Sequence, residues 1–142
     1  MNALFAGLVV AMLAPPAAAE TVAAALPTEH YLHHLGELIN GYRQGQGLEP
    51  LAFADDLAAL AGEHSAKMAV QHQLSHEGFR NRFRSASSKV CVENVGWNFP
   101  TPEALLEGWL RSPTHHRNLL EPEVSRMGLA VSTRYVTFFA CR

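Results

Sequence analysis

The sequence predicts an α+β fold, because helical and strand-like segments follow one another in mixed order. Three segments have the apolar spacing of helices and three have the composition or alternation of strands. They do not alternate in the strand–helix–strand order that parallel sheets require. A length of 142 residues, 48% hydrophobic content and a net charge of −2 suit one globular domain. We therefore expect a single sandwich of helices against a small sheet.

Three segments have helical periodicity: residues 28–43, 55–73 and 101–111. Each begins at a residue whose side chain can cap a helix, namely Thr28, Asp55 and Thr101. The third also has a proline in its first turn, which favours a helix start. Residues 78–89 between helix and strand are polar with little periodicity, so we expect a loop there.

The histidines inside the first two helices are interpreted as structural. His64 lies on the apolar face of its helix, where a hydrogen-bonded interior histidine is more common than a ligand. The i, i+3 and i+4 spacing of the histidines in the first helix occurs often by chance, so they are interpreted as a polar face. These residues are His30, His33 and His34.

Strand-like composition marks residues 90–97, 127–131 and 135–140, the last two forming a terminal hairpin. In residues 90–97 the alternation puts Glu93 on the same face as Cys91. Burying an unpaired carboxylate costs several kcal/mol. Glu93 is therefore expected to have a partner or a function.

Residues 1–19 read as a secretory signal, with an apolar run and small residues before Glu20. A membrane anchor is the alternative, but about 20 unbroken apolar residues are needed to span a bilayer. We expect residues 20–27 to be a short lead-in and residues 28–142 to be the exported domain. Its location would be secreted or periplasmic.

In an oxidising compartment, Cys91 and Cys141 would form one disulfide, with two buried free thiols as the alternative. The charge does not predict nucleic acid binding, because the chain has 11 Lys and Arg residues and 13 Asp and Glu residues. The basic cluster at residues 80–84 is interpreted as a solvated loop or helix end. We expect a monomer.

Ser112 precedes Pro113, which disfavours helical geometry at the residue before it. The third helix is therefore expected to end near Arg111 in a tight turn. This turn would present His115 or His116 to a neighbouring cleft.

Seven short segments occur in order between residues 30 and 142: Asn40-Gly-Tyr-Arg43, Gly47-Leu-Glu-Pro-Leu51, His64-Ser-Ala-Lys-Met68, Leu74-Ser-His76, Glu93-Asn-Val95, Trp109-Leu-Arg-Ser-Pro-Thr-His115 and Asn118-Leu-Leu120. Together they resemble the bacterial branch of the CAP (SCP/PR-1-like) superfamily. This resemblance implies a three-layer α-β-α sandwich with a small antiparallel sheet between helices. It also implies a cleft of two histidines and acids that binds a divalent ion in some members.

Residue by residue, the resemblance assigns the cleft histidines to His76 and His115 and the acid to Glu93, with His116 in solvent. Many relatives have a second acid at the position where this chain has Ser112. Ser112 would line the cleft without binding metal. Two imidazoles and water would hold Zn²⁺ or another divalent cation with open positions. Glu93 would orient the water, bind the metal or, if the protein is a hydrolase, act as the base.

Three alternatives stay open at this point. The cluster of His76, Glu93 and His115 would be a purely structural polar network in the first. In the second, the protein binds a lipid or sterol, as some relatives do, at the loop of residues 97–100, with a lipid or another cell-envelope component as partner. The third is a metal-dependent hydrolase.

Overall fold

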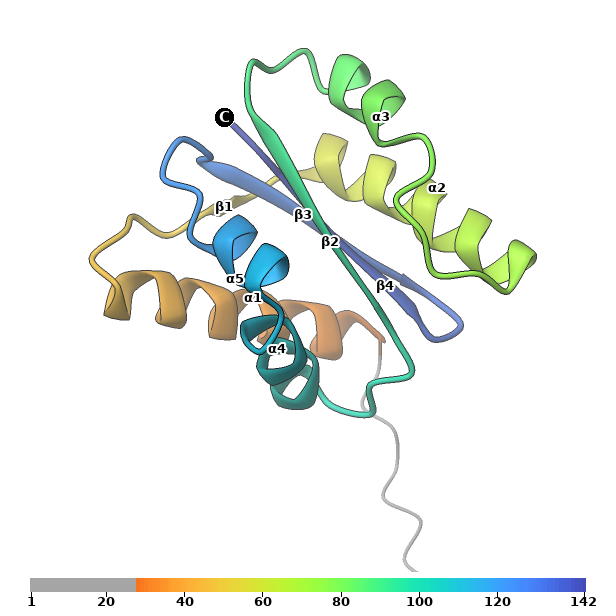
Figure 1. Cartoon of the computed structure of the whole chain (residues 1–142), viewed down its shortest axis with the longest axis horizontal. Helices are drawn as coiled ribbons and strands as arrows, with labels where there is room; N and C mark the ends of the chain where they lie inside the picture. The colour runs from red at the N-terminus through yellow and green to blue at the C-terminus, as the bar shows by residue number, and fades with distance from the viewer. Residues whose placement is uncertain (1–27) are drawn as a thin grey trace, which may run out of the picture.

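The computed structural model describes residues 28–142, in which five helices and four strands form (Figure 1). The helices are α1 (Thr28–Gly45), α2 (Asp55–Gln71), α3 (Phe79–Ser85), α4 (Pro102–Leu110) and α5 (Pro113–Leu119). The strands are β1 (Ala52–Phe53), β2 (Cys91–Trp97), β3 (Arg126–Ser132) and β4 (Tyr135–Cys141). The expected signal and lead-in, residues 1–27, lie outside the described residues.

A four-stranded sheet in the order β1-β3-β4-β2 forms the middle layer. β4 pairs antiparallel with both β2 and β3, and the short β1 pairs parallel with β3. Helices α1, α4 and α5 lie on one side of the sheet, and α2 and α3 lie on the other (Figure 1). The α+β class and the three-layer sandwich are therefore confirmed.

Each face of the sheet buries its own core. On the α1 side, Leu35, Trp109 and Phe138 are almost fully buried. On the α2 side, Leu57 and Phe139 form a smaller cluster with the disulfide. Phe138 and Phe139 face opposite sides because successive strand residues alternate. The hydrophobic effect thus holds helices on both faces of the same strand.

The predicted hairpin and disulfide are both confirmed. β3 and β4 pair from Arg126↔Cys141 to Ser132↔Tyr135, so a two-residue turn joins them. Cys91 and Cys141 are direct partners across β2 and β4, with Cα atoms 4.1 Å apart, and they are bonded. The disulfide thus ties the edge strand β2 to the centre of the sheet.

Residues 78–89 differ from expectation, because α3 forms within them. The ring of Phe79 packs edge-on against Phe139, and Arg82 is only 8% exposed. The buried Arg82 and Ala86, together with the partly buried Phe79, anchor the helix to the sheet. The prediction of a solvated basic cluster is thus wrong for Arg82, although Arg80 and Arg84 are exposed.

The segment after α4 also differs, because a helix that was not expected, α5, begins at Pro113 directly after the predicted turn near Arg111. Pro113 occupies the first turn of α5, and the amide of His116 donates to the carbonyl of Ser112 at 2.8 Å. Proline disfavours a helix before it but is well suited to the first helical position. The same residue therefore ends one helix and starts the next.

Candidate functional site

The three predicted site residues lie together along the outer edge of β2. His76 precedes α3, Glu93 is in β2, and His115 is in α5. The ring centroids of His76 and His115 are 6.2 Å apart, and Nδ1 of His76 is 3.0 Å from Oε1 of Glu93. Segments on the two sides of the sheet thus meet at this strand (Figure 1).

Glu93 is held by a buried guanidinium. Its side chain is 1% exposed, Nε of Arg82 donates to Oε2 at 2.7 Å, and a terminal nitrogen of Arg82 donates to Oε1 at 2.8 Å. This two-pronged geometry is the strongest form of a carboxylate ion pair. A third Arg82 nitrogen donates to the carbonyl of Glu77 at 2.9 Å, which fixes the segment next to His76.

The contact with Glu93 also fixes the tautomer of neutral His76. An ionised carboxylate only accepts hydrogen bonds, so Nδ1 of His76 donates to it. Nε2 then carries the free lone pair. Burial raises the pKa of Glu93, but the hydrogen bonds from His76 and Arg82 outweigh it and leave the pKa below its ordinary value. Glu93 is therefore ionised at neutral pH.

His64 is an interior histidine, as predicted. It is 2% exposed, and Nε2 donates to the carbonyl of Ser75 at 2.7 Å. Burial is the main cause that lowers the pKa of His64, although the Glu93 carboxylate 3.7 Å away opposes it. Within residues 28–142, its buried Nδ1 has no hydrogen-bond partner. His64 thus positions the residue directly before His76.

Two asparagines tie α5 to β2 beside the site. The amide of Asn94 donates to the carbonyl of His115 at 3.0 Å. The amide of Asn118 lies 3.0 Å from both the carbonyl of Glu93 and Oδ1 of Asn94. Burial, and secondarily His76, lower the pKa of His115, so its imidazole is neutral at pH 7.

His116 and Ser112 take lesser roles. The prediction that His116 faces solvent is wrong, since its Nε2 is 2.7 Å from the hydroxyl of Tyr42 and the residue is partly buried. Ser112 is partly buried at the start of α5, where its side chain makes no capping hydrogen bond.

Sequence reasoning missed Arg82, Asn94 and Asn118 as site residues. Arg82 lies between two exposed arginines, and no local pattern shows which of the three is buried. The asparagines act on backbone carbonyls of segments more than 20 positions away. Only the buried carboxylate of Glu93 signalled that a partner was needed.

Within the described part of the chain, no group of three or more His, Cys, Asp or Glu side chains is arranged to hold a metal ion. The cleft offers two imidazoles, His76 and His115, and a carboxylate whose oxygens both accept hydrogen bonds.

The profile of the Cysteine-rich secretory protein family, CAP, matches residues 37–142. The chain belongs to this family. All seven segments predicted to carry the resemblance lie within the matched range.

Two proteins of Bacillus subtilis (strain 168) are similar in sequence. The uncharacterized protein YkwD is 30% identical over 125 residues, covering 80% of this chain and 49% of YkwD. The uncharacterized membrane protein YlbC is 27% identical over 110 residues, covering 71% of this chain and 31% of YlbC. The CAP chain thus spans half or less of the length of these relatives.

Solved structures share the CAP fold. An extracellular protein containing a SCP domain from Bacillus anthracis matches with a TM-score of 0.76 and 24% identity, covering 81% of this chain and 41% of that one. An outer surface protein of Borrelia burgdorferi matches with a TM-score of 0.72 and 20% identity, covering 82% and 96%. No helix within residues 28–142 is long and apolar enough to cross a membrane.

Proposed function

We propose that the CAP cleft binds a divalent metal ion such as Zn²⁺ through Nε2 of His76 and a ring nitrogen of His115. The observation that carries the proposal is the contact of His76 with the buried Glu93 at 3.0 Å. Ligand histidines usually donate their other ring nitrogen to a carboxylate, which orients the ring and raises its basicity. In this role Glu93 positions a ligand and is not itself a ligand.

The spacing of the two imidazoles supports a shared ion. Two imidazoles on one tetrahedral zinc have ring centroids about 5 Å apart. The observed separation is 6.2 Å, so the rings would have to approach by roughly 1 Å. The side chain of His76 is 50% exposed and so has room to move. With two protein ligands, the expected affinity is lower than that of a three-histidine site.

Hydrolysis with Glu93 as general base is the less favoured function. A base needs an accessible oxygen within reach of the water it activates. Both oxygens of Glu93 are hydrogen-bonded to Arg82 or His76, and burial excludes water from them. A hydrolase of this kind would require turnover that Glu93→Gln abolishes while circular dichroism shows an intact fold.

Zinc titration by calorimetry tests the metal site. We expect one binding event for the full chain that is lost in the His76→Ala/His115→Ala double variant. His30→Ala/His72→Ala is the matched control, because both of these histidines are exposed and neither lies in the cleft. Equal affinity in the cleft variant and the wild type would refute the site, and equal loss in both double variants would assign binding to surface histidines.

We also propose that residues 1–19 direct export. The disulfide supports this, because such bonds persist in oxidising compartments. Expression of the full chain in a bacterial host should yield periplasmic or secreted protein that begins at Glu20. Cytoplasmic protein that retains Met1 would contradict the proposal.

A further inference from the structure

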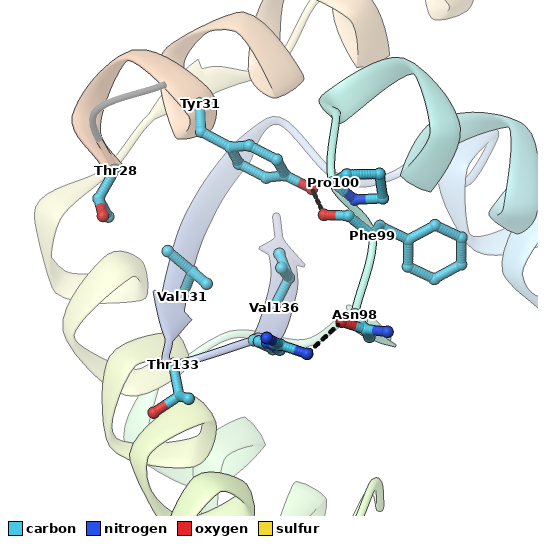
Figure 2. Close-up of a pocket in the computed structure, with 9 residues that line it drawn as sticks. Thr28, Tyr31, Asn98, Phe99, Pro100, Val131, Thr133 and Val136 are labelled. Carbon is cyan, nitrogen blue, oxygen red and sulfur yellow. Dashed lines mark hydrogen bonds between the residues drawn. The ribbon is translucent and has the colours of Figure 1, made fainter. Parts of the chain in front are cut away.

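A hollow outside the cleft lies between the start of α1, the loop after β2 and the β3–β4 turn (Figure 2). Its volume is about 540 Å³, within the range of pockets for small organic ligands. Tyr31, Val131 and Val136 provide apolar walls. The ring of Phe99 points away from the hollow, towards Gly108 of α4. This hollow shares no lining residue with the His76–His115 cleft.

Two of the four non-glycine residues with positive φ values in residues 28–142 lie at the rim of the hollow. Asn98 and Thr133 both line it and have φ values of 61° and 56°. Asparagine tolerates this left-handed region, but a β-branched residue there is an outlier. Thr133 begins the two-residue β3–β4 turn, a position where glycine is favoured. Strain of this kind often marks ligand-binding sites.

The charge of the hollow is one-sided. A terminal nitrogen of Arg134 donates to Oδ1 of Asn98 at 3.0 Å, and within residues 28–142 no carboxylate pairs with this guanidinium. No Asp or Glu is among the residues that line the hollow. At the opposite end, burial and then the nearby Glu103 raise the pKa of Tyr31 to about 12. A single negative charge is therefore favoured at the Arg134 end and disfavoured at the Tyr31 end.

We propose that this hollow binds a compact cyclic or aromatic carboxylate, whose carboxylate pairs with Arg134 while its ring lies against Tyr31. One guanidinium complements one carboxylate. A long acyl chain would need a continuous apolar channel, whereas Thr28, Asn98 and Thr133 interrupt the apolar lining. The loop expected to bind lipid thus contributes to a pocket of a different chemistry.

Titration of ¹⁵N-labelled full chain with indole-3-carboxylate and its neutral carboxamide tests the proposal by NMR. The amides of Asn98 and Thr133 should shift saturably, with the carboxylate bound about tenfold more tightly than the carboxamide. Arg134→Gln should remove this difference. Arg84→Gln is the matched control and should preserve it, because Arg84 is also exposed and also donates to an asparagine, Asn81.

Three results would overturn the proposal. The first is the absence of shifts at these amides up to about 10 mM carboxylate. The second is an equal effect of Arg134→Gln and Arg84→Gln. The third is binding of palmitate or cholesterol that is tighter than binding of the carboxylate and is unchanged in Arg134→Gln, which would assign the hollow to lipid. The His76→Ala/His115→Ala variant should bind the carboxylate normally, so failure of the metal site leaves this test intact.

Discussion

Removal of the Arg82 guanidinium should leave the buried carboxylate of Glu93 without its main partner. In Arg82→Leu, Glu93 loses both guanidinium contacts, of 2.7 and 2.8 Å, and keeps the hydrogen bond from His76. Breaking a buried pair from one side costs about 3–5 kcal/mol. Screening is weak because Arg82 and Glu93 are only 8% and 4% exposed. Since His76 retains part of the stabilisation, we expect a loss of about 3 kcal/mol near pH 7.

The pH dependence follows from the sign of the shift. In the wild type, the pKa of Glu93 lies below its ordinary 4.5, so its contribution is present above about pH 4.5 and is lost as the pH falls through the folded-state pKa. In Arg82→Leu, we expect burial to raise this pKa, so the variant is penalised as pH rises. The difference between the proteins should therefore shrink towards pH 4.

Urea denaturation at pH 7 and about pH 4, monitored by tryptophan fluorescence, measures the difference in stability between Arg82→Leu and the wild type. Arg84→Leu is the control, because it changes an exposed arginine of the same helix and should stay within about 0.5 kcal/mol of the wild type. The reasoning fails if Arg82→Leu costs less than about 1 kcal/mol at pH 7, or if its cost is the same at both pH values.

Three further changes probe the sandwich through chemical denaturation. Gly128→Ala would place a Cβ 2.1 Å from the backbone carbon of Leu57, so β3 and α2 must separate, and we expect a loss of at least about 2 kcal/mol; unchanged stability would contradict this close approach. Replacing both Cys91 and Cys141 with alanine removes a bond that closes a loop between residues 50 positions apart in the unfolded chain. The free energy of unfolding should fall by about 4 kcal/mol on the chain-entropy estimate, and an unchanged unfolding midpoint would show that the bond adds no stability. In Trp109→Phe, the buried carbonyl of Val95 in β2 loses the indole N–H that donates to it at 2.9 Å, so the free energy of unfolding should fall by about 1–3 kcal/mol. Unchanged stability would show that water replaces this donor.

Local sequence patterns predicted most of the fold. Helical spacing located α1, α2 and α4, alternation located β2, and β-prone composition located the β3–β4 hairpin, all within one or two residues. The helical pattern succeeds because each helix buries one face, which leaves a periodic apolar signal, whereas β4 is buried on both faces and appears as a continuous β-prone run. α3 and α5 were missed because each has only seven residues, too few for a reliable period.

The cleft was predicted less completely, and for a different reason. His76, Glu93 and His115 were identified from a family resemblance, since they lie 17 and 22 positions apart and no local motif joins them. Arg82 could not be chosen over Arg80 or Arg84, because burial of one arginine depends on where the helix docks.

By itself, the sequence determined the fold class, the hairpin and the demand that Glu93 have a partner, because these follow from periodicity and the cost of burying charge. Only the tertiary structure decided that the partner is Arg82 and that a buried His64 supports the segment before His76. It also decided that the β3–β4 turn, with Thr133 at a positive φ value, lines a hollow separate from the cleft. Such contacts join distant segments and depend on the docking of whole elements, which short-range patterns do not encode.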